Sequence, residues 1–111
     1  MSVFRMEAAE GGSIDARYIQ SCDLTITNIG SEEFDILMHG YHLDGVFYVG
    51  LNHVPAGGSV VIPNLMPHNR TFSLLMITNI NYSGTTVITV HAKNQGQLVA
   101  LFSNAHFSVI E

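Results

Sequence analysis

The chain has few charged residues and very few basic ones. Charged side chains make up 12% of its 111 residues, against about 25% in an average soluble domain. Four lysine and arginine residues and a formal net charge of −5 leave no basic patch that could neutralise a run of phosphates. We therefore expect the protein to bind neither nucleic acid nor the surface of an anionic membrane.

The sequence also lacks a long apolar run and a second cysteine. No segment approaches the roughly 20 apolar residues of a spanning helix, and residues 1–5 lack the features of a secretion signal. The expectation is a protein that is made in the cytoplasm and does not insert into a membrane. Cys22 stands alone, so no internal disulfide can form. Its place in an alternating segment predicts a small core residue.

Motifs of known catalytic chemistry are absent as well. The sequence contains no G-x-S-x-G elbow, no H-E-x-x-H helix and no glycine-rich phosphate loop. The neighbouring acids Glu32, Glu33 and Asp35 fit solvated loop residues better than the two carboxylates of a glycosidase, which flank a cleft. We expect no enzyme, no catalytic residue and no cofactor.

Six histidines are the main candidates for a metal site. His39 and His42 are three residues apart, which places their side chains on opposite faces of a strand. A cupin-like site needs about three ligands that converge inside a barrel, and the sequence lacks the H-x-H pair that puts two ligands on one face. We expect no metal ligand, and a metal-binding cupin-like protein ranks third among the functions considered.

What the sequence does contain is a repeated strand pattern, which is clearest between residues 22 and 45. Cys22, Leu24 and Ile26 alternate with polar residues, and this period of two describes a strand with one buried face. The dipeptide Asp44-Gly45 is typical of a two-residue hairpin in which both residues have positive φ. Strands are expected over residues 18–28, 34–42, 46–54, 60–62, 72–80, 86–93, 98–102 and 105–110.

This spacing predicts an all-β fold: an antiparallel β-sandwich of about seven or eight strands, with hairpin and crossover links in a Greek-key or jelly-roll manner. We expect the sandwich domain to span residues 18–111. Residues 1–17 show no sustained period, so we expect an N-terminal extension there. Its segment 2–6 does alternate, which predicts either a frayed end or a strand added to the sheet of its own or a neighbouring subunit.

Two further patterns favour self-association. The segment from Phe72 to Ile80 is apolar on both faces, so something must pack on its outer face. Charge usually protects an edge strand, and the chain is nearly neutral after Asp35. These patterns predict a non-enzymatic structural protein that forms a homo-oligomer or filament by strand addition. The residues expected to carry this assembly are Val3, Phe4, Met6, Gly11 and Gly12.

Several motifs resemble those of a known group. They are Leu24-Thr25-Ile26-Thr27-Asn28 followed by Gly30-Ser31, the link Val54-Pro55-Ala56-Gly57-Gly58-Ser59, and Val90-His91-Ala92-Lys93 with Gly96 and Leu98 to Ala100. Over most of residues 20–108 the chain resembles small β-sandwich proteins of Gram-positive spore-forming bacteria, and it is loosely similar to self-assembling spore appendage subunits. The resemblance implies a structural subunit of a filament or layer on a spore or cell surface. The chain departs from the cysteine-linked appendage proteins because it has no cysteine near its start.

A carbohydrate- or small-ligand-binding module is the alternative function, from a different class. Tyr41, Phe47, Tyr48 and Tyr82 would supply the aromatic platform on which a sugar stacks. The same four residues also fit packing partners on neighbouring strands. A glycan array or a thermal-shift panel separates the two functions.

Overall fold

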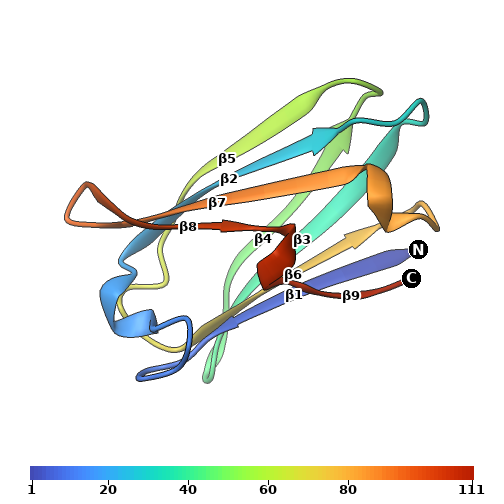
Figure 1. Ribbon diagram of the computed structural model, residues 1–111. Helices are drawn as coiled ribbons and strands as arrows, with labels where there is room; N and C mark the ends of the chain where they lie inside the picture. The colour runs from blue at the N-terminus through green and yellow to red at the C-terminus, as the bar shows by residue number, and fades with distance from the viewer.

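Nine strands form two antiparallel sheets in the computed structural model, which describes residues 1–111. The five-stranded sheet has the order β4-β3-β6-β1-β9 and the four-stranded sheet the order β5-β2-β7-β8, and the two lie face to face (Figure 1). The strands are β1 (Ser2–Ala8), β2 (Ser21–Asn28), β3 (Phe34–His42), β4 (Gly45–Val54), β5 (Ser59–Leu65), β6 (Phe72–Thr78), β7 (Thr86–Asn94), β8 (Gln97–Ser103) and β9 (Ser108–Ile110), with short 3₁₀ turns η1 (Ala16–Tyr18), η2 (Ser83–Thr85) and η3 (Asn104–His106). The predicted β-sandwich is confirmed, with one strand more than expected because residues 2–8 form β1. No helix of the chain has the length and apolar character that a membrane crossing needs.

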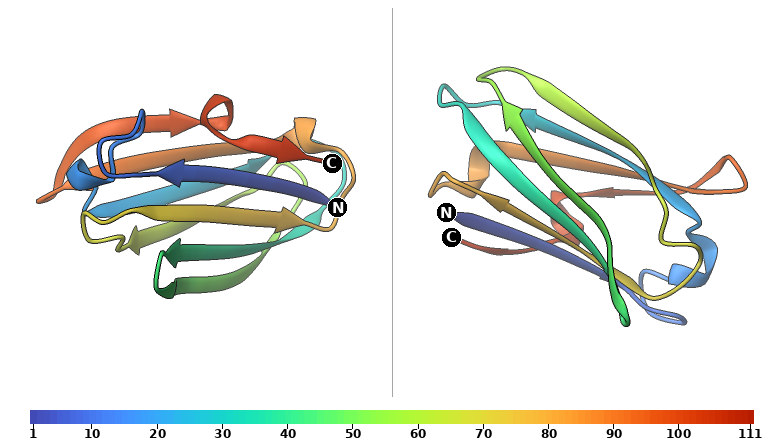
Figure 2. Two further views of the ribbon diagram at one scale, coloured as in Figure 1. Left: turned by 90° about the horizontal axis from the view of Figure 1, so that it is seen from below. Right: turned by 180° about the vertical axis from the view of Figure 1, so that it is seen from behind.

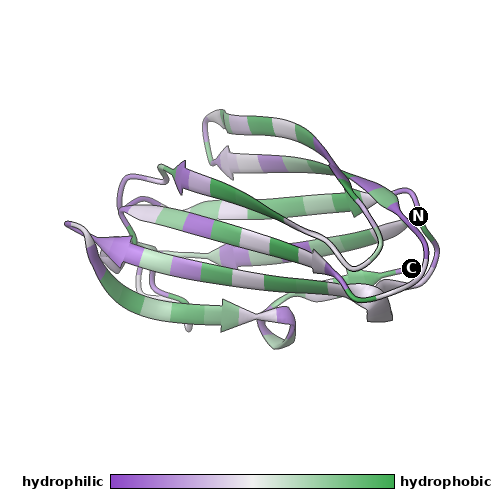
Figure 3. Cartoon of the chain, turned by 90° about the horizontal axis from the view of Figure 1, so that it is seen from above, coloured by the Kyte–Doolittle hydropathy of each residue, from purple (hydrophilic) through white to green (hydrophobic).

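The core follows from the alternation along the strands. In β3, for example, Phe34, Ile36 and Met38 are at most 1% exposed while the residues between them face outwards. Figure 3 shows a similar alternation of hydrophobic and hydrophilic residues in several of the other strands. The buried apolar side chains of both sheets form one cluster of 22 residues. Cys22 belongs to it, so the prediction of a small core residue is confirmed, and burial raises the pKa of its thiol to about 12.

The prediction of a separate N-terminal extension over residues 1–17 is wrong, although residues 2–6 do form a strand in the sheet of their own subunit, which was one of the alternatives for this segment. Strand β1 lies between β6 and β9 inside the five-stranded sheet (Figure 2, left), where Phe4 pairs with Met76 on one side and with Val109 on the other. The side chains of Phe4 and Met6 are at most 1% exposed. The division into an extension over residues 1–17 and a domain over residues 18–111 therefore does not hold, because β1 fills the core of its own subunit.

The glycine pair Gly11-Gly12, which was expected to take part in assembly, belongs to an ordered turn. The Gly12 N–H donates to the Ala9 carbonyl at 3.0 Å, and the Gly11 N–H donates to the Asp15 carboxylate at 3.1 Å. The Arg17 guanidinium donates to the same carboxylate at 2.7 Å and holds the pKa of Asp15 well below its usual range. Gly11 takes the left-handed conformation, with φ at 76°, which a residue with a side chain rarely adopts.

Only two links are hairpins within a sheet, β3–β4 and β7–β8, and the others cross between the sheets. The β7–β8 hairpin has a tight two-residue turn, in which Gln95 and Gly96 have φ values of 52° and 80°. The β3–β4 turn differs from the expectation. A register shift after Gly40 pairs His42 with Gly45, so the turn residues lie one position earlier than Asp44-Gly45, and positive φ is confined to Gly45, at 147°.

Candidate functional site

The most unusual surface of the molecule is the outer face of the five-stranded sheet. Strand pairing aligns Leu37 with Leu51 on one side and with Ile77 on the other. Val3 in turn lies between Ile77 and Ile110. One aliphatic residue from each strand thus stands in a continuous line across the sheet. We call this line the aliphatic row, and its members are Leu51, Leu37, Ile77, Val3 and Ile110.

The row next to the aliphatic row adds further apolar side chains at the centre of the face. Val49 and Leu75 flank His39 in the next row, and Val49 is 60% exposed. The two ends of the aliphatic row are even more open, since Leu51 is 71% and Ile110 70% exposed. Charged groups border this centre on both sides. Arg5 forms an ion pair with Glu7 at 2.8 Å, and Asp35, two residues before Leu37, lies 2.8 Å from Nδ1 of His53. Aliphatic patches of this extent on a soluble protein usually mark an interaction surface.

The four-stranded sheet presents a different outer face. Thr25 and Thr89 lie side by side on β2 and β7, and Thr27 shares a hydrogen bond of 2.8 Å with Ser59 on β5. Hydroxyl groups therefore occupy much of this surface, where the other sheet has aliphatic side chains. The continuous line of aliphatic residues is therefore specific to the five-stranded sheet, although single aliphatic side chains such as Val61 and Leu101 are exposed on the other sheet.

The five residues expected to carry assembly lie in three different places in the structure. Val3 joins the aliphatic row, while Phe4 and Met6 point into the core. Gly11 and Gly12 lie in the ordered turn after β1. The segment that was expected to need a cover is β6, whose outward residues Ser73, Leu75 and Ile77 are half-buried by their neighbours. Register brings Leu37, Leu51 and Ile110 to the same face, and sequence reasoning missed all three.

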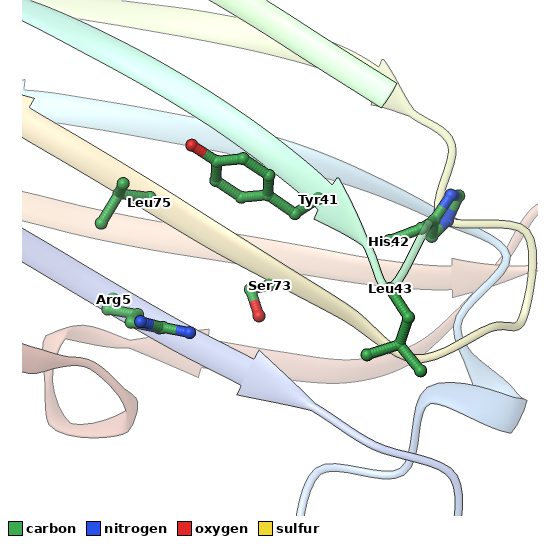
Figure 4. A pocket seen from close by; sticks show the side chains of 6 residues that line it. All are labelled: Arg5, Tyr41, His42, Leu43, Ser73 and Leu75. Carbon is green, nitrogen blue, oxygen red and sulfur yellow. The ribbon is translucent and has the colours of Figure 1, made fainter. Parts of the chain in front are cut away.

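A hollow of about 400 Å³ lies on this face, next to the β3–β4 hairpin. Figure 4 shows Tyr41 and Arg5 on either side of it, with Ser73 at its floor and Leu43 at its hairpin end. The Tyr41 hydroxyl is 2.6 Å from Nδ1 of His39. The hollow combines apolar walls with a guanidinium and hydroxyl groups, a composition that suits a small polar ligand.

His42 is held at the hairpin end by contacts to both ring nitrogens. Nδ1 lies 2.8 Å from the Arg70 guanidinium, and Nε2 lies 2.8 Å from the Pro67 carbonyl oxygen. Since a guanidinium only donates and a carbonyl only accepts, this arrangement requires a neutral imidazole with its proton on Nε2. The ring also stacks on Phe47, with centroids 4.5 Å apart. His42 therefore organises the hairpin and has no nitrogen free for a metal.

The remaining histidines do not gather either. His53 lies between two acids, with Asp35 at 2.8 Å from Nδ1 and Glu33 at 3.6 Å from Nε2. The carboxylates stand on opposite sides of the ring, so they cannot converge on one ion. His106 accepts a hydrogen bond from the Ser103 N–H at the start of η3. No group of three or more histidine, cysteine or acidic side chains is arranged to hold a metal ion.

Asp35→Asn is expected to lower the pKa of His53. The hydrogen bond to Asp35, together with the charge of Glu33, raises the pKa of His53 above its ordinary value of 6.5. The stability from this contact is complete below about pH 6.5 and is lost as the pH rises through the raised pKa. An NMR titration of the imidazole proton measures the shift, and Glu32→Gln is the control because Glu32 makes no contact with His53. A midpoint that Asp35→Asn leaves unchanged would contradict the assignment.

The four aromatic residues proposed for a sugar platform do not share a surface. Tyr41 lines the hollow, whereas Phe47 and Tyr48 pack partly against the core. Tyr82 precedes the η2 turn and is 65% exposed. The platform predicted from these residues is therefore wrong, and Tyr41 alone remains beside a hollow that a ligand could enter.

Comparison with known proteins supports the fold alone. No family model matches the chain, and no curated protein matches it. Among solved structures, the chain is similar to the Anabaena sensory rhodopsin transducer, with a TM-score of 0.54 and 15% sequence identity over 85% of this chain and 89% of that one. At a sequence identity this low, the similarity supports a shared β-sandwich architecture and gives no information about function.

Proposed function

We propose that this protein is a non-enzymatic structural subunit that self-associates, and that the outer face of the five-stranded sheet is the contact between copies. The observation that carries the proposal is the aliphatic row, which crosses all five strands without a charged residue. Leaving Leu51 and Ile110 about 70% exposed is unfavourable, since burying such a side chain is worth about 1.5–3 kcal/mol.

The face is large enough for a stable contact. Five strands spaced at about 4.8 Å, with an average length of about seven residues at about 3.4 Å per residue, cover roughly 550 Å². Two copies facing one another would bury about 1,100 Å², which exceeds the roughly 1,000 Å² that a specific interface needs. Two such faces can pack at the same distance of about 10 Å that separates stacked sheets in a sandwich.

A second copy is a fitting occupant because the face is complementary to itself. Apolar residues meet apolar residues at its centre, so the net charge of −5 brings no like charges together there. The adjacent charges of Arg5 and Glu7 form a dipole, which a copy related by a two-fold axis can oppose with its own. Self-complementarity of this kind is what a two-fold contact between identical subunits requires.

The N-terminal segment is not the route of assembly. Donation of residues 1–10 to a neighbour would remove β1 from between β6 and β9 and expose Phe4 and Met6. We therefore place the contact on the face of the sheet. The resemblance of residues 20–108 to small sandwich proteins of spore-forming bacteria accords with a subunit of a filament or layer on a spore or cell surface, and we include that location in the proposal.

Leu51→Glu is expected to weaken the assembly by roughly tenfold or more, because it places a carboxylate in a contact that excludes water. Val61→Glu is the matched control. Val61 is a comparably exposed aliphatic residue, at 62% against 71% for Leu51, and it lies on the outer face of the other sheet. Sedimentation velocity over a concentration series measures both variants. An assembly that Leu51→Glu and Val61→Glu leave equally intact would contradict the proposed contact surface.

The hollow beside Tyr41 favours a small-ligand-binding module as the second candidate function. A thermal-shift panel of simple sugars and small carboxylic acids tests it, with Tyr41→Ala and Tyr82→Ala as paired variants. A compound that stabilises the unmodified protein and Tyr82→Ala but not Tyr41→Ala would support this function. A panel without any shift would leave self-association as the function to pursue.

A further inference from the structure

Strand β8 is an edge strand, and between Leu98 and Phe102 its outer backbone groups have no partner within the chain, whereas the Ser103 N–H donates to His106. The strand pairs with β7 on one side and with nothing on the other. None of the 15 backbone hydrogen bonds made outside the regular elements involves residues 97–103. The row of N–H and C=O groups along one side of β8 is therefore free to pair with another strand.

The other three edges of the sandwich are protected, and β8 is not. Strand β5 contains Pro63, which cannot donate to a ladder, and β9 is three residues long. Strand β4 carries His53, which the acids Asp35 and Glu33 flank. Strand β8 reads Gln-Leu-Val-Ala-Leu-Phe-Ser and contains no charge, proline or glycine. Between its polar ends, Gln97 and Ser103, its exposed residues are apolar: Leu98 at 59%, Val99 at 46% and Leu101 at 57%.

An apolar groove of about 190 Å³ runs beside the free edge of β8. Its walls are Val99 and Phe102 on one side and Ile14, Tyr18 and Ile19 on the other. The wall opposite β8 is fixed by the Asp15–Arg17 ion pair, at 2.7 Å. Strand addition uses main-chain hydrogen bonds for affinity and pockets for alternate side chains, and β8 offers both.

We propose that β8 pairs antiparallel with β8 of a second copy, which joins the two four-stranded sheets into one continuous sheet. A second copy fits because a strand that faces itself across a two-fold axis presents donors to acceptors and acceptors to donors. None of the nine acidic residues lies on β8, so the pairing brings no like charges together along the strand.

This inference rests on the proposed function and extends it. A subunit with one contact on the face of the five-stranded sheet and a second along β8 has two different two-fold interfaces. Repetition of two such interfaces gives either a closed tetramer or an open chain. The pairing of β8 would thus turn a face-to-face dimer into a larger assembly, and strand addition would occur at β8 and not at β1.

The test compares hydrogen exchange and mass in three forms of the full chain. In the unmodified protein, the amides of residues 98–102 should exchange more slowly as the protein concentration rises. Leu101→Lys should remove this protection and weaken the assembly by roughly tenfold or more, because a charge on an edge strand opposes pairing. Val61→Lys, the same kind of change on the protected edge strand β5, should leave both the exchange and the mass unchanged.

The outcomes separate this inference from the proposed function. If the amides of residues 98–102 in the unmodified protein exchange at a rate that does not depend on concentration, the proposed pairing of β8 is wrong. This measurement does not depend on whether any variant folds. If Leu51→Glu weakens the assembly and Leu101→Lys does not, the contact through the face of the five-stranded sheet is supported and the pairing of β8 is contradicted. If Leu101→Lys weakens it and Leu51→Glu does not, the edge contact stands and the proposed face is wrong.

Discussion

Phe4→Ala is expected to lower the free energy of unfolding by about 3–5 kcal/mol, the usual loss when a fully buried phenylalanine is truncated. The side chain of Phe4 is 0% exposed, and its strand lies between β6 and β9, so the cavity would open in the centre of the core. Urea unfolding followed by circular dichroism measures the change.

Val3→Ala is the control for this experiment. Val3 is the neighbour of Phe4 on β1, but its side chain stands on the half-buried outer face, so its truncation should cost about 1 kcal/mol. Equal and small losses for Phe4→Ala and Val3→Ala would show that residues 2–8 are a dispensable arm, and would contradict the intramolecular position of β1.

The second large effect is expected from Asn28→Ala, at about 2–3 kcal/mol of stability. Asn28 is 0% exposed and lies where β2 ends and the chain crosses to the other sheet. Its amide donates to the Glu32 carbonyl at 2.7 Å and to the Val54 carbonyl at 3.3 Å, and its oxygen accepts from the Gly30 N–H at 3.0 Å. Without the amide, the buried Val54 carbonyl loses this donor, a loss that typically costs about 1–3 kcal/mol.

Asn79→Ala provides the matched comparison. Asn79 also follows the end of a strand and binds backbone, since its oxygen accepts from the Asp35 N–H at 2.9 Å, but that bond is exposed to water. Water can replace the lost partner, so the change should cost about 1 kcal/mol or less. A loss from Asn28→Ala no larger than that from Asn79→Ala would mean that the crossover does not depend on the buried amide.

The sequence predicted the strands well because their signal is local. The strand over residues 34–42 has the bounds that alternation predicts, and the turn at Gln95 and Gly96 follows from residue preference. The β3–β4 turn was misplaced by one residue because a register shift after Gly40 depends on the partner strand. The buried role of Asn28 was missed for a similar reason: a turn residue gives no sign of which distant carbonyls surround it.

The position of β1 could not be predicted from its own residues. The alternation of Val3 and Arg5 with Phe4 and Met6 indicates a strand, but its partners lie at residues 72–78 and 108–110. The free energy that stabilises β1 comes from contacts with residues distant in sequence, and the seven residues of the strand do not indicate which partners these are. The glycine pair Gly11-Gly12 reads as a flexible hinge, whereas hydrogen bonds to Ala9 and Asp15 hold it in an ordered turn.

The candidate surface was predictable only in part. The apolar character of β6 on both faces indicated that its outer face needs a cover. The aliphatic row itself consists of residues 3, 37, 51, 77 and 110, which only the register of five strands brings into line. In the same way, the unprotected character of β8 depends on its place at the edge of a sheet, which its composition cannot reveal.

The central claim, that copies of this chain associate, is tested most directly by the mass of the unmodified protein at sedimentation equilibrium over a range of concentrations. The account predicts a mass that rises with concentration to a multiple of the 12.1 kDa of one chain. A mass of 12.1 kDa at every concentration would contradict it, and would leave the aliphatic row as an exposed surface without a partner of its own kind.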